Sequence, residues 1–458
     1  MTTATACPPG ERPRKVFAVW FADLRRWSVN SFYTVCWHWP AKDIAPLARA
    51  LERKSVSVNK KKIGLENLQL VTLHFDGEME PRDTNGQAAF KGKLFEAVAG
   101  DVVYSKIDVR NGAIGVVPPE MPKVAVSSEY PVYHVRREAA LPEYIKLLFR
   151  THAFRRQINS MISGASGRKR VQPSDLEEID VPLPRLPVQQ AIVEHWNKAR
   201  QTVDAAGRAL SKLVADLERK LRRIYRRERT HDVIGTRYFV LNFKDMAAWD
   251  AKSGRAAAFR LACPGFRRMG EFIEDATELV RPAAEPDHDW PIYGVNNKEG
   301  VFLNCRQKGR DFNSAYKRIH KDWFFHNPTR CNVGSLGIVP DVPNDAITSP
   351  EYPVWRLKPD VPEPLLPGFV AVLIQTPFFI DLVQFNRVGA VKQRMYFENL
   401  AEVRVPYLPV REQKKFSEAR EQALAQLADA RRHAEKEKAK VEAMILGTVP
   451  VERGTQCE

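Results

Sequence analysis

The sequence predicts an α+β protein in which one module occurs twice, with a long helix after each copy. Three observations lead to this prediction. Blocks of sequence recur about 222 residues apart, each copy runs from strand-like to helix-like stretches in the same order, and a proline-rich run precedes a heptad pattern in both. A repeat that keeps one spacing across several separated blocks indicates a duplicated module.

Five blocks carry the repeat. The matched pairs are Phe17, Val19, Phe21, Asp23, Leu24 and Trp27 with Phe239, Leu241, Phe243, Asp245, Met246 and Trp249; Asp101-Val-Val-Tyr104 with Asp322-Trp-Phe-Phe325; Gly112-Ala-Ile-Gly-Val-Val117 with Gly334-Ser-Leu-Gly-Ile-Val339; Glu129-Tyr-Pro-Val132 with Glu351-Tyr-Pro-Val354; and Leu186-Pro-Val188 with Leu408-Pro-Val410.

Each copy begins with strands and continues with helix. Short β-branched runs at residues 101–107, 113–117 and 130–135 predict strands in the first copy. Residues 141–162 and 368–385 predict the helical part of each copy. The proline-rich runs at 181–187 and 405–409 predict stiff boundaries, since proline fixes its own φ and biases the preceding residue away from helix.

A long helix is expected after each boundary. From residue 188 to about 229 there is no proline, and apolar residues alternate in steps of four and three. That spacing keeps one seam on a partner helix. A second, alanine-rich seam follows from about 411 to 446, so the two helices are expected to form an antiparallel coiled-coil pair.

These patterns divide the chain as follows: a flexible tail at 1–15, the first module at 16–187, the central long helix at 188–230, the second module at 231–409, the C-terminal long helix at 410–447 and a flexible tail at 448–458.

The charge balance indicates a polyanionic partner. The 458 residues carry 71 Lys and Arg against 55 Asp and Glu, a formal charge of +16. Nucleic acid is the leading candidate over an anionic membrane, and a merely solubilising surface is the other interpretation. No window approaches 18 consecutive apolar residues, which argues against a membrane span.

Composition also bears on redox compartment and metal binding. The six cysteines are far apart and never form CxxC, which argues against a structural zinc site and a disulfide framework. No apolar segment of a secretory signal is visible at the start of the sequence, so a cytoplasmic location is expected.

No motif for catalysis is evident. GxGxxG at a helix start, GxxxxGK[ST], HExxH and GxSxG are all absent, and so is the Asn-Pro-Pro-aromatic tetrapeptide of amino-methyltransferases. No clustered acidic metal ligands are evident either. The chain by itself is therefore expected to be non-catalytic.

With catalytic motifs absent, the polar residues of the loops are the candidates for a function in binding. Loops of both copies carry side chains suited to phosphates and base edges, since Arg can fork onto guanine and Asn or Gln onto adenine, whereas Lys on phosphate only positions the protein. The candidate DNA-binding residues are Lys106, Arg110, Asn111, Arg168, Lys169 and Arg170 in the first copy, and Asn327, Arg330, Asn332, Lys392, Gln393 and Arg394 in the second.

With these motifs, the chain resembles the specificity subunit of type I restriction-modification systems. The resemblance covers nearly all of residues 16–446. It depends on the repeat, on Gly164-Ala165 followed by Val171-Gln-Pro-Ser-Asp-Leu-Glu-Glu-Ile179, and on Val181-Pro-Leu-Pro-Arg-Leu-Pro-Val-Gln-Gln190 leading into a long helix. The second copy keeps this frame more loosely, with two residues fewer between its Val-Pro and Leu-Pro pairs.

The resemblance implies two target recognition domains, each reading one half of a bipartite double-stranded DNA sequence. It implies methyltransferase subunits docked on the long helices, and restriction and translocase subunits that join for cleavage. S-adenosylmethionine, ATP and Mg are expected in those partners, with no cofactor or metal bound by this chain. The helix residues expected to serve docking are Ile192, Trp196, Val203, Leu210, Leu217, Phe416 and Leu427.

Three alternatives stay open at this point. One is the DNA reader of a methylation-only or related phage-defence complex, and another is a coiled-coil scaffold that binds protein or RNA. An intrinsic nuclease is the most distant of the three.

Overall fold

The structure is a computed structural model, and it describes residues 37–58, 69–82, 92–160, 170–236, 238–246, 251–389 and 392–451. The chain divides into two compact units. Unit 1 is Met1–Thr202 with Arg431–Glu458, and unit 2 is Val203–Ala430. The first block of the repeat, residues 17–27, lies outside the described residues.

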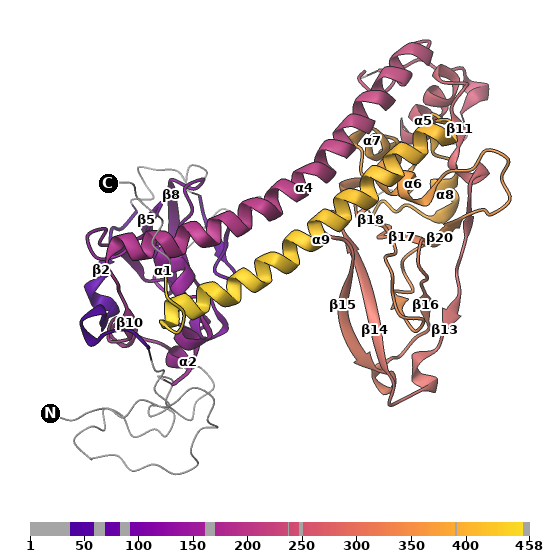
Figure 1. Cartoon of the computed structure of the whole chain (residues 1–458). Coiled ribbons are helices and arrows are strands. Elements are labelled where there is room, and N and C mark those ends of the chain that lie inside the picture. The colour runs from indigo at the N-terminus through magenta and orange to yellow at the C-terminus, as the bar shows by residue number, and fades with distance from the viewer. Residues whose placement is uncertain are drawn as a thin grey trace. The chain divides into compact units, whose positions relative to one another are not determined.

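Two long helices each contribute one end to each unit. They are α4 (Leu186–Glu228) and α9 (Val410–Leu446). The part of α4 up to Thr202 and the part of α9 from Arg431 onward belong to unit 1. In each unit the two helix segments run in opposite directions (Figure 1). The α+β class with two long helices, expected from the sequence, is confirmed.

Unit 1 contains ten short strands and three short helices within its described residues (Figure 1). In chain order the strands are β1 (Ile44–Pro46), β2 (Leu51–Lys54), β3 (Val71–Leu73), β4 (Met79–Pro81), β5 (Leu94–Val98), β6 (Val102–Tyr104), β7 (Ile114–Val116), β8 (Lys123–Ser127), β9 (Val132–Val135) and β10 (Asp180–Pro182). The helices are α1 (Pro142–Leu148), α2 (His152–Ser160) and α3 (Pro173–Glu177), with 3-10 turns η3 (Ala41–Asp43), η4 (Leu47–Arg49) and η6 (Val109–Asn111).

Within the described residues, unit 2 repeats this order and also contains one helix before its first strand and one further short strand. Its strands are β11 (Arg267–Arg268), β12 (Ile273–Asp275), β13 (Leu279–Val280), β14 (Asp289–Asn296), β15 (Gly300–Lys308), β16 (Tyr316–Arg318), β17 (Phe324–His326), β18 (Leu336–Ile338), β19 (Ile347–Thr348), β20 (Val354–Leu357) and β21 (Arg404–Val405). Its helices are α5 (Ala251–Ala262), α6 (Pro367–Leu373), α7 (Pro377–Asn386) and α8 (Phe397–Ala401), with 3-10 turns η7 (Phe243–Asp245), η8 (Met269–Glu271), η9 (Pro282–Ala284), η10 (Gly309–Asp311) and η11 (Cys331–Val333).

A four-stranded sheet forms the centre of each unit. Its order is β2-β9-β6-β7 in unit 1 and β12-β20-β17-β18 in unit 2. The apolar runs at these strands are buried on both faces. Val102 and Tyr104 of β6 pack in the core that contains the short helices, and Val103 packs in a second core against β5, β8 and β4. Two-sided burial explains why the central strands read as continuous apolar runs.

The strand registers show that the two units are copies. Tyr104 pairs with Ile114 in unit 1, and His326 pairs with Leu336 in unit 2, each 222 residues further along the chain. The second sheet repeats too. The parallel bridge between Leu70 and Ala125 recurs as the pairing of Ile292 with Ile347. The hairpin β14–β15 is longer than its counterpart β3–β4.

One matched block is corrected by this register. The sequence repeat matched Asp101 with Asp322. The strand registers instead place Asp322 at the position that Gly100 occupies in unit 1. Both of these residues are in the left-handed region, with φ of 89° at Gly100 and 64° at Asp322. Aspartate tolerates this region better than most residues, so it can replace glycine at the start of the strand.

The alignment at the helix starts is corrected as well. Gln189 accepts a hydrogen bond from the Leu141 amide (2.9 Å) and donates to the carbonyls of Ala139 and Pro184. Gln413 does the same with Leu366 (2.9 Å), Pro364 and Leu408. Pro184 therefore corresponds to Leu408, and no residues are missing from the second copy there.

The first long helix begins two residues earlier than the sequence predicted, whereas the second begins at Val410, the predicted boundary. Pro187 lies in the first turn of α4 instead of ending the preceding boundary. Proline is well tolerated there because the amide it lacks has no partner within the helix.

The predicted helical part of each copy is two short helices. Thr151 separates α1 from α2, accepting from the Phe154 amide (3.2 Å), and Thr376 accepts from the Phe379 amide at the start of α7 (3.2 Å). The long helices add a carboxylate at each of these helix starts. Glu442 accepts from the His152 amide (2.5 Å), and Glu218 accepts from the Phe378 amide (2.8 Å). Negative charge is favourable at a helix N-terminus.

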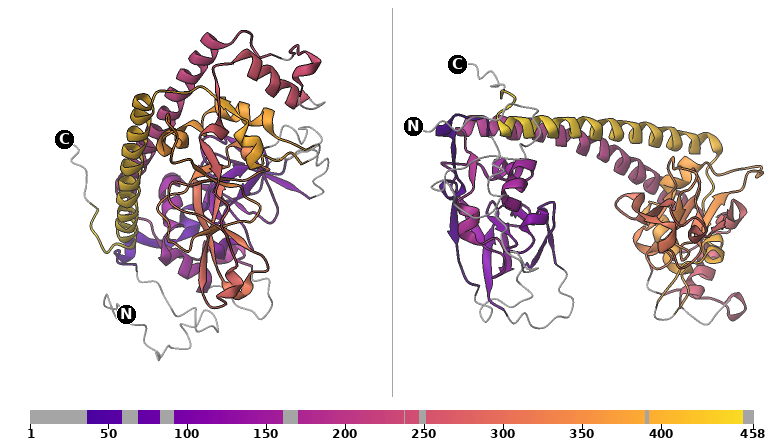
Figure 2. Two further views of the ribbon diagram at one scale, coloured as in Figure 1. Left: turned by 90° about the vertical axis from the view of Figure 1, so that its right-hand side faces the viewer. Right: turned by 90° about the horizontal axis from the view of Figure 1, so that it is seen from below.

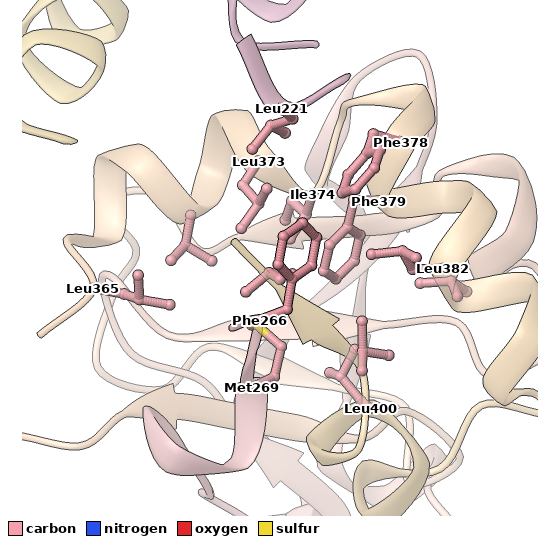
Figure 3. Packing of buried hydrophobic residues seen from close by; sticks show 14 of the residues in the cluster. Leu221, Phe266, Met269, Leu365, Leu373, Ile374, Phe378, Phe379, Leu382 and Leu400 are labelled. Carbon is pink, nitrogen blue, oxygen red and sulfur yellow. The ribbon is translucent and has the colours of Figure 1, made fainter. Parts of the chain in front are cut away.

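The core of unit 2 shows how the long helix is anchored. Leu221 of α4 packs in one cluster with Leu373 of α6, Phe378 and Phe379 of α7, and Phe266 of the loop that precedes β11, all labelled in Figure 3. The strands and short helices of each unit lie to one side of its long-helix segments (Figure 2). The module and the helix ends thus share one hydrophobic core in each unit.

The buried glutamines provide a test of this anchoring. Gln189→Ala and Gln413→Ala each leave one amide and two carbonyls without their partner, and an unsatisfied buried group costs about 1–3 kcal/mol. We expect a fall in the free energy of unfolding on the order of 2 kcal/mol, measured by urea denaturation. Amide hydrogen exchange should show the loss of protection only in the unit that carries the substitution.

The control is Gln190→Ala. Gln190 is exposed and bonds Glu194 one turn further along α4, so its loss should leave stability almost unchanged. Equal effects of Gln190→Ala and Gln189→Ala would contradict the anchoring role.

Candidate nucleic-acid interface

Two loops of unit 1 that are far apart in sequence meet at one junction. The first loop follows β6 and contains Lys106, and the second leads into α3 and contains Val171. The Val171 amide donates to the Lys106 carbonyl (2.9 Å), and the Lys106 amide donates to the Glu129 carbonyl (3.1 Å). Three segments are therefore tied together by backbone hydrogen bonds.

The first loop has a defined shape. Ser105 Oγ accepts from the Asp108 amide (3.1 Å), and Gly112 ends the 3-10 turn with a φ of 104°. A positive φ favours glycine. This turn leaves the side chains of Arg110 and Asn111 exposed.

Unit 2 builds the same junction with different residues. The Met395 amide donates to the Pro328 carbonyl (2.9 Å), as Val171 does to Lys106. Asn327 Oδ1 accepts from the Arg330 amide (3.3 Å) in place of Ser105, and Gly334 ends the turn with a φ of 87°. The side chains around this common backbone differ, because Lys106, Arg110 and Asn111 are replaced by proline, asparagine and valine.

An ion pair recurs at both junctions. Arg170 lies 3.3 Å from Glu129, and Arg394 lies 3.6 Å from Glu351. The four side chains are between 38% and 67% exposed, and pairs this exposed add little to stability. The pair therefore orients the arginine more than it stabilises the fold. Glu129 and Glu351 were visible in the sequence as a matched block, but not as partners of the basic residues.

The structure thus brings together the described members of the two predicted clusters in each copy. Arg110, Asn111, Arg330 and Lys392 are exposed, and Lys106 and Asn332 are half-buried. Arg168 and Lys169 lie outside the described residues.

Several predicted residues have partners within their own unit. Lys106 Nζ donates to the Ser128 carbonyl (2.9 Å), and Gln393 accepts from Lys252. Asn327 uses Oδ1 inside its turn and donates from Nδ2 to Tyr352 (3.3 Å). Contact of these side chains with DNA stays a prediction.

The docking prediction is corrected for two helix residues. Ile192 and Leu217 have no exposed surface, because they belong to the cores of unit 1 and unit 2. The apolar seam of a helix packs against a neighbouring apolar surface. For Ile192 and Leu217, that surface belongs to the adjoining module. Trp196, Val203, Leu210, Phe416 and Leu427 are half-buried, and their role in docking stays a prediction.

Two further searches of the described residues concern metals and membranes. No group of three or more His, Cys, Asp or Glu in them could hold a metal ion. No single described helix is long and apolar enough to cross a membrane. Only α6 and α7 taken together meet that criterion, bent by 79°, and their apolar side chains lie in the core of unit 2.

The sequence of unit 1 matches a known family. Residues 81–204 match the family model of the type I restriction modification DNA specificity domain. This match confirms the resemblance to type I specificity subunits. The matched span includes both loops of the unit 1 junction and the first part of α4. The matched span also holds Arg110, Asn111 and Arg170.

Three solved structures are similar to this chain over most of its length. The HsdS subunit from Thermoanaerobacter tengcongensis is 15% identical, with 89% of this chain and 97% of that chain covered and a TM-score of 0.32. The type I restriction-modification S subunit from M. genitalium is 11% identical, with 89% and 96% covered and a TM-score of 0.39. A chain from a structure on complex assembly and conformational transition of the type I R-M system is 15% identical, with 88% and 96% covered and a TM-score of 0.32.

No curated protein matches this chain.

A buried histidine supports the junction of unit 2. His326 Nε2 bonds the Met395 carbonyl (2.9 Å), and Nδ1 accepts from Trp355 Nε1 (3.3 Å). Tyr104 occupies this position in unit 1 and donates to the Val171 carbonyl (3.3 Å). Complete burial lowers the pKa of His326 to about 4.

This pKa predicts acid sensitivity of unit 2. Between about pH 6.5, the ordinary histidine value, and pH 4, the unfolded chain binds a proton that the folded unit does not, so stability falls as pH falls through this window. The complete loss in the free energy of unfolding across this window is on the order of 3 kcal/mol. Urea unfolding at pH 7.5 and pH 5 should show it, and His326→Gln should reduce it. A pH dependence unchanged in His326→Gln but reduced in the exposed His231→Gln would contradict this assignment.

Proposed function

We propose that this chain is the DNA-recognition subunit of a type I restriction-modification complex, with each unit reading one half of a bipartite target. The observation that carries the proposal is the loop junction, which is built twice on one backbone and presents different polar side chains each time. The family match of residues 81–204 and the excess of basic residues agree with it.

The chemistry of the exposed side chains fits duplex DNA. An arginine such as Arg110 or Arg330 can place two donors on guanine, and Asn111 can pair with adenine, in the major groove. Arg170 and Arg394 are held by a carboxylate, so their guanidinium groups are already oriented before a phosphate or a base arrives. Different side chains on equivalent loops give the two units different sequence preferences.

The chain itself supplies no catalysis in this proposal. Methyltransferase subunits dock on α4 and α9 and bring S-adenosylmethionine, and restriction and translocase subunits bring ATP and Mg. Both long helices reach into both units, so they are the elements that set the spacing between half-sites.

The test of the proposal is the methylation pattern in cells that express the chain with its methyltransferase. We expect long-read sequencing to show a bipartite motif with two defined halves. Arg110→Ala should relax the half read by unit 1, and Arg330→Ala should relax the other half. Loss of one base-specific contact is worth about 1–3 kcal/mol, or roughly a five- to 150-fold loss of discrimination at that position.

Arg223→Ala is the matched control, because Arg223 is exposed on α4 and outside both junctions. Equal relaxation of both halves by either variant would contradict separate reading by the two units. Preference for RNA over duplex DNA in a gel-shift competition with the methyltransferase present would overturn DNA recognition altogether.

Helix length should control the gap between the half-sites. Removing one heptad from the middle of α4 and one from the middle of α9 shortens each helix by about 10 Å, at 1.5 Å per residue. That length corresponds to roughly three base pairs at 3.4 Å each. We expect the spacer in the methylated motif to shorten by this amount while both half-sites keep their bases. An unchanged spacer would contradict the role of the helices.

A further inference from the structure

A hairpin tip lies beside the first loop in each unit. In unit 1 the tip is residues 74–78, between β3 and β4, and in unit 2 it is residues 296–300, from the last residue of β14 to the first residue of β15. Neither tip contains a residue that the sequence predicted to bind DNA. Each belongs to the second sheet, so its place beside the loop is set by tertiary packing alone.

Arg150 holds the unit 1 tip against the first loop. Its guanidinium donates to the carbonyls of Phe75 (3.2 Å) and Gly112 (3.1 Å) and also to that of Ile114. Burial lowers the pKa of Arg150 to about 10, which leaves it charged at neutral pH. Hydrogen bonds from a charged donor are stronger than neutral ones, so this clamp restrains both segments. Lys146 of α1 adds an ion pair with Glu78 of the tip (2.8 Å).

Two glycines allow the backbones to approach this closely. A Cβ on Gly112 would lie 2.0 Å from the Phe75 carbonyl oxygen, and a Cβ on Gly115 would lie 2.1 Å from that of Gly77. No other residue fits at either position without moving the tip. The tip and the first loop therefore form one rigid surface.

Unit 2 keeps this arrangement with other residues. A Cβ on Gly337 would lie 2.8 Å from Val301 Cγ2, and one on Gly334 would lie 3.4 Å from Asn297 Cβ. Gln375 occupies the position of Arg150 and donates to the Leu336 carbonyl (3.1 Å). The recurrence shows that the tip position belongs to the module and is not a feature of one copy.

The side chains that the tips present are exposed and differ between the units. Phe75 is 58% exposed although its carbonyl is clamped, so its ring extends away from the core. Asn297 is exposed at the same position of unit 2. An exposed phenylalanine contributes little to folding. Beside Arg110 and Asn111 it is suited to contact a thymine methyl group or to insert at a base step. Asparagine is suited to adenine.

We propose that the hairpin tip is a third reading element of each unit, with Phe75 and Asn297 as specificity-determining residues. The inference rests on the proposed function, since it names further residues that read the same half-sites. In unit 1, where Arg150 ties the tip to the first loop, the tip adds base contacts without the entropy loss of ordering a flexible segment.

The experiment compares Phe75→Ala, Phe75→Trp and Asn297→Ala in the complete complex with its methyltransferase. Phe75→Ala should weaken binding to the cognate duplex about tenfold and relax the unit 1 half of the methylated motif. Binding to non-cognate duplex should stay unchanged, because it depends on phosphate contacts. Phe75→Trp should retain most of the affinity, and Asn297→Ala should relax only the unit 2 half.

Tyr238→Ala is the control, since Tyr238 is an aromatic residue that is 82% exposed in unit 2 and belongs to neither tip. If the wild-type complex selects a bipartite site and Phe75→Ala and Asn297→Ala leave the motif unchanged, the inference is overturned while the proposed function stands. Relaxation of both halves by Phe75→Ala alone would also overturn it. A wild-type complex without any sequence selectivity would overturn the proposed function, and this inference with it.

Discussion

One backbone hydrogen bond, made once in each unit, holds the candidate interface together. It joins the Val171 amide to the Lys106 carbonyl in unit 1 and the Met395 amide to the Pro328 carbonyl in unit 2. Because the bond uses only main-chain atoms, it places no demand on the side chains of the two loops. The exposed side chains at the junction can therefore differ between the units while the loops stay in contact.

In both units, the buried residues that form the scaffold are alike, whereas the exposed residues differ. The buried positions that hold the module to the long helices are nearly identical in chemistry, as the hydrogen bonds of Gln189 and Gln413 show. Exposed positions on the same loops differ, as Arg110 and its counterpart Asn332 show. A duplicated domain that conserves its interior and varies its exposed loops is suited to present two different binding surfaces.

The buried residues that support the two junctions also differ in chemistry between the units. Tyr104 and His326 occupy the same place and bond the same carbonyl of the second loop, but only the histidine titrates between neutral pH and pH 4. Arg150 and Gln375 both donate to the strand after the glycine turn, but only the arginine also reaches the hairpin tip. The two junctions therefore share geometry and differ in electrostatics.

The duplication, the α+β class and the two long helices could all be predicted from the sequence, because apolar periodicity and glycine or proline positions are local signals. The candidate basic residues were also local signals, since their side chains match phosphates and bases. Three features could be established only from the tertiary structure. The first is the one-residue shift that makes Asp322 equivalent to Gly100. The others are the burial of Ile192 and Leu217 in the module cores and the position of the hairpin tips beside the first loops. Each depends on which segments approach one another across tens of residues, and close backbone approach leaves almost no trace in a single sequence beyond an isolated glycine.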